Sequence, residues 1–179
     1  AARPLVLFMP ASFAAWAAIM RQSREMAAGF DIMGGDAMDH PDTAKLLGNA
    51  AEGFLQTTFP YSATVEKMST EADLFTRAWY ERHPDDIPNP NAALGYNCYL
   101  MLKDALERAG TDDPEAVTAA LAELRDLRTP LGLITLHANH DAVIPVGFSE
   151  HRRGHTVYPV EIIPECRLPK GCACLQFLK

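Results

Sequence analysis

The sequence lacks any run of about 20 apolar residues, the length that a membrane-spanning helix requires. Positive charge is also scarce, because 16 Lys and Arg residues stand against 23 Asp and Glu residues, for a net charge of -7. A nucleic-acid partner needs a basic face, so this balance argues against nucleic-acid binding. The chain has no initiator Met and no secretion leader, and it begins just before an apolar segment. We therefore expect a further segment upstream of Ala1.

Sequence motifs of catalysis are missing as well. There is no Gly-x-Ser-x-Gly elbow, no Walker loop, and no Gly-x-Gly-x-x-Gly turn after the first apolar segment. Asp36 and Asp39 form a carboxylate pair in sequence only, on a turn that more naturally begins a helix. We therefore expect a protein that is not an enzyme and that holds no cofactor.

What the sequence does contain is a strand, helix and strand pattern at its beginning. Leu5–Ser12 and Asp31–Asp36 are apolar segments of strand length, and Phe13–Ala28 between them has helical spacing of its apolar residues. Ligands collect at the carboxyl ends of parallel strands, where Ser12 and Asp36 would lie side by side. A helix N-terminus offers unpaired N–H groups to an anion, and a carboxylate accepts hydrogen bonds from an ammonium. Together they would hold a small zwitterion.

The rest of the chain predicts one more strand, then helices, then a β-hairpin. These elements cover residues 53–59, 71–83, 91–109, 114–127 and 131–148, with the hairpin turn at 138–141. A set of apolar residues within 91–109 recurs at helical spacing, so we expect these residues to face a core: Leu94, Cys98, Met101, Leu102, Ala105, Leu106 and Ala109. We expect Gly110 to end this helix and Asp113 to cap the next one. Cys98 would then be a buried, inert thiol.

A metal site is an alternative that histidines and cysteines of the C-terminal part leave open. Imidazole and thiolate are the usual zinc donors. The residues with suitable spacing are His137, His140, His151, His155, Cys172 and Cys174. However, His137 and His140 fall in the predicted hairpin turn, where a spacing of three does not place both rings on one face. We therefore expect solvated turn histidines, a C-terminal tail without regular structure, and no metal.

Short motifs in a fixed order resemble one family. They are Met33–Asp36, Ala51–Phe54, Ala93–Tyr96, Asp113–Glu115 and Gly132–Thr135. Their conjunction over about residues 1–158 resembles the type I periplasmic binding proteins of ABC transporters, in the leucine/isoleucine/valine and amide-binding branch. The resemblance implies an α/β fold. It would be the open parallel-sheet lobe of such a protein, incomplete, with extra helices and a C-terminal β-hairpin.

The same resemblance implies a domain organisation and a function. Residues 1–60 and 131–158 would form part of the second lobe, 61–130 would be helices that pack on a first lobe, and 159–179 has no assigned role. Members of the family trap a small solute between two lobes outside the cytoplasm and present it to a membrane permease. We expect a branched-chain amino acid or a similar small amino acid or amide. Because the first lobe is missing from this chain, we also expect self-association.

Five candidate ligand contacts follow from the resemblance. Ser12 lies at the N-terminus of the first predicted helix, where the family often has an aromatic residue that contacts the ligand. Ala11 and Phe13 are its neighbours in sequence. Asp36 matches the acidic position that pairs with a ligand ammonium, and Asn91 falls near another pocket position. The alternatives are a plain helix cap for Ser12 and a turn carboxylate for Asp36. An amide or aromatic-acid sensor that feeds a regulator is the alternative function.

Overall fold

The computed structural model describes residues 5–40, 42–63, 69–137, 139–152 and 155–162. The chain divides into two compact units, which we describe separately. Unit 1 comprises Ala1–Phe59 and Val146–Glu161, and unit 2 comprises Pro60–Pro145 and Ile162–Lys179. No helix among the described residues has the length and apolar character needed to cross a membrane.

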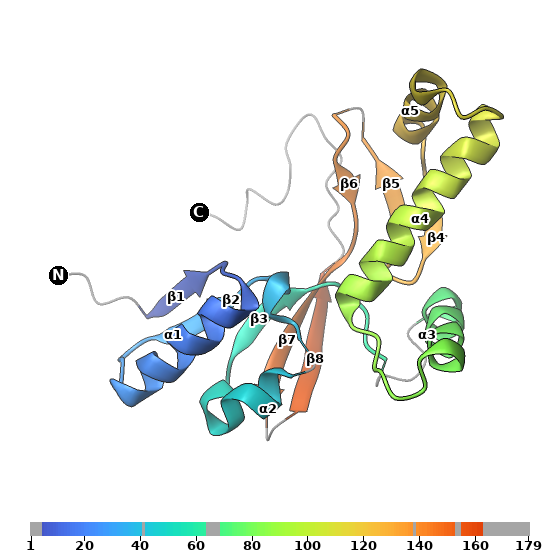
Figure 1. Cartoon of the computed structure of the whole chain (residues 1–179). Helices are drawn as coiled ribbons and strands as arrows, with labels where there is room; N and C mark the ends of the chain where they lie inside the picture. Colours follow the sequence, from blue (N-terminus) through green and yellow to red (C-terminus); the bar gives the residue numbers. More distant parts are fainter. Residues whose placement is uncertain (1–4, 41, 64–68, 138, 153–154, 163–179) are drawn as a thin grey trace. The chain divides into compact units, whose positions relative to one another are not determined.

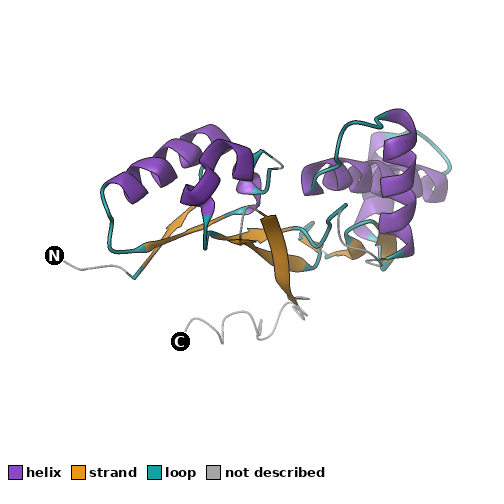
Figure 2. Cartoon of the chain, turned by 90° about the horizontal axis from the view of Figure 1, so that it is seen from below, coloured by secondary structure: helices purple, strands orange, loops and turns teal. Residues whose placement is uncertain are grey.

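Unit 1 is built around one five-stranded sheet with the strand order β1-β2-β3-β7-β8 (Figure 1). Its elements are β1 (Val6–Met9), α1 (Phe13–Glu25), β2 (Asp31–Gly34), the 3-10 helix η1 (Asp36–Met38), α2 (Thr43–Leu47), the 3-10 helix η2 (Gly48–Ala51), β3 (Leu55–Thr58), β7 (Val146–Arg152) and β8 (His155–Ile162). Strands β1, β2 and β3 pair in parallel, while β7 pairs antiparallel with β3. The predicted adjacency of the two opening strands is therefore confirmed. Figure 2 shows the helices of unit 1 along one face of this sheet.

The core of unit 1 lies between α1 and the sheet. Trp16 and Met20, four positions apart on one helix face, are fully buried together with Met38 and Phe54. Gly34 ends β2 in very tight surroundings, because a Cβ there would lie 2.2 Å from the sulfur of Met38 and 2.6 Å from the Phe54 ring. Packing therefore requires glycine at position 34, whereas a Cβ at Gly35 would meet no atom within 4 Å.

Unit 2 consists of helices and a small antiparallel sheet of order β4-β5-β6. Its elements are α3 (Thr70–Arg82), α4 (Pro90–Ala109), α5 (Pro114–Ala122), β4 (Leu127–Thr129), β5 (Gly132–Leu136) and β6 (Ala142–Val143). Ser69, Asn89 and Asp113 cap the three helices, each accepting a hydrogen bond from a backbone N–H of the first turn. Gly110 ends α4 in the left-handed region at φ 65°, as the sequence predicts.

The predicted hairpin of 131–148 is only half correct. β5 and β6 do pair antiparallel, but the second strand stops at Val143. After Pro145 the chain begins β7, which joins the sheet of unit 1 instead. Residues 131–145, grouped with 1–60 from the sequence, thus lie in unit 2, where β5 pairs with β4. β4 itself overlaps the end of the helix predicted for 114–127.

The face of α4 that packs inward also differs from the prediction. Ala105 is fully buried as predicted, but so are Ala93 and Asn97, which lie outside the predicted stripe, whereas Cys98 is exposed and Leu102 is 48% exposed. The prediction of a buried Cys98 is therefore wrong. Small residues such as Ala93 and Ala105 allow the close approach of α4 to its neighbours, and Leu102 and Leu106 are exposed, whereas Met101 packs against the cluster of Leu124, Ile134 and Leu136.

Candidate functional site

The carboxyl ends of β1 and β2 lie side by side, because Met9 pairs in register with Gly34. Ser12 comes after Pro10 and Ala11, and Asp36 comes after Gly35, on neighbouring connections at one edge of the sheet. Both are exposed, and Ala11 beside Ser12 is half-buried. The structure thus brings together the anion-binding and cation-binding candidates that the sequence predicts. We call this edge, with Ala11, Ser12, Phe13, Asp36 and His40, the strand-tip site.

Ser12 is the N-cap of α1 and has an extended backbone. Its carbonyl accepts a hydrogen bond of 2.9 Å from the N–H of Trp16, but its hydroxyl makes no capping hydrogen bond within the described part of the chain. The first backbone N–H groups of a helix have no partner inside the helix. Without a side-chain cap, these donors and the partial positive charge of the helix end remain available to an anion.

Asp36 opens the 3-10 helix η1, which packing and hydrogen bonds hold in place. Met38 is fully buried in the core of unit 1, and Asp39 is 6% exposed. The hydroxyl of Thr58, at the end of β3, donates a hydrogen bond to the Asp39 carboxylate. The loop that carries Asp36 is therefore tied to the neighbouring strand. The Asp36 carboxylate itself stays exposed at the strand-tip site, where it can accept hydrogen bonds from a cation.

A stack of three rings runs from the core to the strand-tip site. The fully buried Trp16 ring lies 5.9 Å from Phe13, and the His40 ring lies 4.4 Å from Phe13 at an interplanar angle of 24°. The backbone N–H of Asp42 donates a 3.1 Å hydrogen bond to Nδ1 of His40. From the sequence His40 is interpreted as a turn residue, since nothing local reveals that its ring meets Phe13.

The other predicted ligand contact, Asn91, belongs to unit 2. It is exposed and directly follows Pro90, the first residue of α4. The structure describes it within unit 2 only, so its part in a ligand site stays a prediction.

The alternative metal donors are spread over both units. His137 is half-buried and His140 is exposed in unit 2, while His151 is buried in β7 of unit 1. Cys172, Cys174 and the side chain of His155 lie outside the described residues. Across the residues that are described, no group of three His, Cys, Asp or Glu side chains could hold a metal ion.

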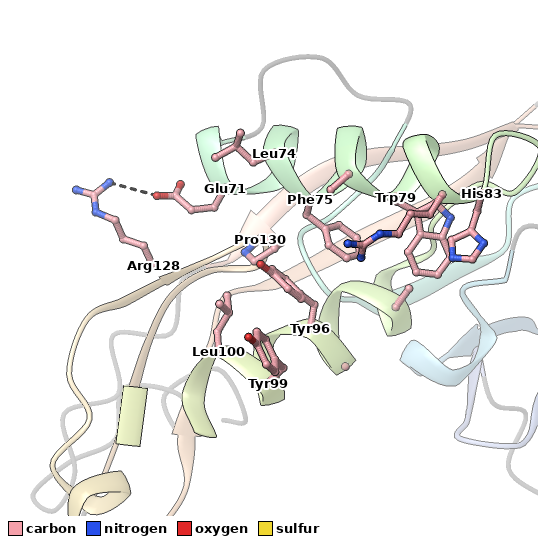
Figure 3. Close-up of a pocket in the computed structure, with 14 residues that line it drawn as sticks. Glu71, Leu74, Phe75, Trp79, His83, Tyr96, Tyr99, Leu100, Arg128 and Pro130 are labelled. Carbon is pink, nitrogen blue, oxygen red and sulfur yellow. Dashed lines mark ion pairs between the residues drawn. The ribbon is translucent and has the colours of Figure 1, made fainter. Parts of the chain in front are cut away.

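Unit 2 contains an aromatic groove that the sequence does not single out (Figure 3). Its volume is about 830 Å³, and its walls include Phe75 and Trp79 of α3 and Tyr96 and Tyr99 of α4. The Phe75 ring stacks on Tyr96 at 5.3 Å and lies 5.9 Å from Trp79. An ion pair of 3.8 Å between Glu71 and Arg128 lies at one end. The helical spacing of these aromatic residues is the sequence signal that could have revealed the groove.

Comparison with known proteins gives a consistent result. The sequence pattern described as periplasmic binding protein matches residues 1–159. The Leu/Ile/Val-binding protein homolog 1 of Brucella suis is 25% identical over 127 residues, which are 71% of this chain and 33% of that protein. The crystal structure of a leucine-binding protein LivK from Thermotoga maritima is 29% identical, with a TM-score of 0.80 over 89% of this chain and 45% of that one.

A more distant structure shows the same fold. The solute-binding protein of an ABC transporter from R. palustris, solved in complex with benzoate, is 18% identical, with a TM-score of 0.71 over 92% of this chain and 46% of that one. The chain thus spans a third to just under half the length of these proteins. The fold resemblance drawn from the sequence motifs is confirmed. Because the family pattern matches most of its residues, the chain belongs to the periplasmic binding protein family.

Proposed function

We propose that this chain is part of an extracytoplasmic solute-binding protein that is not an enzyme. Its ligand is a branched-chain amino acid or a similar small amino acid or amide. The bound solute is passed to the permease of an ABC transporter. The names of the relatives support the class of ligand, since they include a Leu/Ile/Val-binding homolog and a leucine-binding protein.

One structural observation carries the proposal: the uncapped N-terminus of α1 and the exposed Asp36 lie on adjacent strand ends. In the bound state the ligand carboxylate accepts hydrogen bonds from the first N–H groups of α1. The ligand ammonium donates to the Asp36 carboxylate. The half-buried Phe13 ring offers an apolar surface for the ligand side group.

The mechanism that follows is equilibrium trapping. A solute held at the strand-tip site presents its remaining surface to a second lobe, and closure of that lobe adds contacts that only the closed state makes. Because a ligand shifts a conformational equilibrium by its differential affinity for the two states, affinity and closure are linked. Delivery to the permease then requires reopening.

Isothermal titration calorimetry of the chain, alone and joined to the remainder of its full-length protein, tests the proposal. The ligands are leucine, isoleucine, valine and propionamide. Asp36→Asn should weaken binding of the amino acids about tenfold or more, since it removes a charge-assisted hydrogen bond. Asp31→Asn is the matched control, because Asp31 is an exposed carboxylate at the opposite end of β2. No heat with any ligand, or equal affinities for Asp36→Asn and the unsubstituted protein, would contradict the proposal.

A second candidate is an amide or aromatic-acid sensor that feeds a regulator. The stack of Phe13 and His40 at the strand-tip site favours it, because planar groups pack well against such rings. The benzoate complex of a relative with the same fold is compatible with it. A profile of binding constants across aliphatic amino acids, amides and benzoate separates the two candidates.

A further inference from the structure

We propose that His40 determines the specificity of the strand-tip site, by making solutes with an aromatic side group bind more tightly than aliphatic solutes of similar size. This inference rests on the proposed binding of a solute at the strand-tip site, and for that site it favours the aromatic ligands of the second candidate over the branched-chain amino acids. His40 is not among the contacts that the sequence predicts. Its role follows from the position and the fixed orientation of its ring.

The ring of His40 is the outermost member of the stack that begins in the core. Trp16 is fully buried, Phe13 is half-buried, and the His40 side chain is 39% exposed. At a centroid separation of 4.4 Å and an angle of 24°, one face of the imidazole covers Phe13. A ligand that reaches this edge therefore meets His40 as well as Phe13. The side group that the ligand presents there decides how well it packs.

The Phe13 ring and one hydrogen bond contact the imidazole, and a second hydrogen bond holds the residue before it. The N–H of Asp42 donates to Nδ1, so Nδ1 carries a lone pair and the proton of the neutral ring is on Nε2. The hydrogen bond between Thr58 and Asp39, the residue before His40, ties the loop to β3. A ring that is already fixed loses little conformational freedom when a ligand packs on it.

An aromatic ligand gains more from this ring than an aliphatic one. Aromatic pairs attract through offset-stacked or edge-to-face contacts beyond the area that they bury. The Nε2–H group is an N–H donor, and N–H groups make favourable contacts with an aromatic face. A branched aliphatic side chain buries apolar area but leaves that donor without a partner. The discrimination should therefore favour phenylalanine over leucine, two amino acids with the same charged groups.

Calorimetry with L-phenylalanine and L-leucine tests the inference on the full chain. For the unsubstituted protein we expect phenylalanine to bind about fivefold more tightly, the equivalent of about 1 kcal/mol. His40→Leu should bring the ratio of the two dissociation constants to about one, chiefly by weakening phenylalanine binding. His40→Phe keeps a ring in the stack but lacks the N–H donor, so it should retain part of the preference for phenylalanine.

His83→Leu is the matched control. His83 is also an exposed histidine against an aromatic ring, 5.0 Å from Trp79, but it lies in unit 2. The His83→Leu substitution should leave the ratio of the two dissociation constants unchanged. Thermal melting of each variant shows whether the substitutions leave the fold intact. Binding of leucine and phenylalanine with equal affinity, or an unchanged ratio in His40→Leu, overturns the inference while the proposed function stands. Binding of neither amino acid overturns the proposed function, and this inference with it.

Discussion

The two units use their longest helices in opposite ways. In unit 1, α1 buries its largest side chains, Trp16 and Met20, completely against the core. In unit 2, α4 buries small side chains such as Ala93, and its outer face leaves Tyr99 at 56% and Leu102 at 48% exposure. The comparison teaches that apolar content alone does not identify the inner face of a helix. The exposed Tyr99 and Leu102 are apolar, and we expect the chain to self-associate through such side chains.

Removing a core side chain from unit 1 should give the largest effect. Trp16→Ala deletes a fully buried indole that contacts Phe13 and Phe54, and it should lower the free energy of unfolding by about 3–5 kcal/mol. Leu102→Ala on the outer face of α4 should change it by less than about 0.5 kcal/mol. Urea titrations followed by circular dichroism measure both. Similar losses in the free energy of unfolding for the two variants would contradict the contrast between the buried face of α1 and the outer face of α4.

A buried polar side chain in unit 1 provides the next test. Gln56 on β3 is fully buried, and its amide oxygen and nitrogen have no hydrogen-bond partner among the described residues. Gln56→Met keeps the shape and removes the unsatisfied amide, so we expect the free energy of unfolding to rise by about 1–2 kcal/mol. Gln22→Met, at an exposed position of α1, is the control and should be neutral. A loss of stability in Gln56→Met would show that the amide is satisfied.

Acidification should destabilise unit 1 through His151. Burial in β7 lowers the pKa of this imidazole from its ordinary value, and Glu52 opposes the shift only in part. The unfolded chain therefore binds the proton first, so stability is full above about pH 6.5 and falls below it, by at most about 1.4 kcal/mol per pH unit. Urea titrations between about pH 7.5 and 5 measure this slope.

The corresponding control separates His151 from the other histidines. His151→Leu should flatten the pH dependence, whereas His140→Gln, at an exposed turn position, should leave the slope as it is. A slope that persists in His151→Leu would place the titrating group elsewhere.

The smallest change in stability is expected on the outer face of α4. Leu102→Glu adds a charge to an exposed position and should alter the free energy of unfolding by about 0.5 kcal/mol or less. It should nevertheless lower the mean mass in sedimentation equilibrium, because we expect the chain to associate through this apolar surface. Thr118→Glu, an exposed position on α5, adds the same charge and should not change the mass. A chain that is monomeric before any substitution would refute the association.

Local signals predict much of the fold. The apolar runs around Leu7 and Ile32 have strand length, and the intervening helical spacing of Trp16 and Met20 matches the buried face of α1. Caps and stops are equally local, since Asp113 and Gly110 occupy the predicted cap positions. Such features depend on residues close in sequence, so a sequence pattern is sufficient to find them.

The features that the sequence does not predict depend on distant partners. Residues 143–148 look like one strand, yet Pro145 separates two strands whose partners, β5 and β3, belong to different sheets. The inward face of α4 depends on which side approaches its neighbours closely, and Ala93 and Asn97 lie on that side while Cys98 does not. Hydrophobicity by itself could not show this.

The strand-tip site also combines features that the sequence predicts with features that depend on distant partners. Ser12 and Asp36 are predictable because each follows a recognisable strand, and parallel pairing brings their positions together. The contact between His40 and Phe13 joins residues far apart in sequence, and the hydrogen bond from Thr58 to Asp39 joins two different strand ends. Neither has a sequence signal. Each of these two contacts can be recognised only once the structure shows where the loop after β2 lies.

Amide chemical shifts measured by nuclear magnetic resonance during a titration with leucine test the central claim most directly. One titration then shows whether leucine binds at the strand-tip site of unit 1 or in the aromatic groove of unit 2. Our account predicts saturable shifts at Phe13, Ala14 and Asp36, with little change at Tyr96 and Tyr99. Shifts confined to Tyr96 and Tyr99, with none at Phe13 or Asp36, would contradict it.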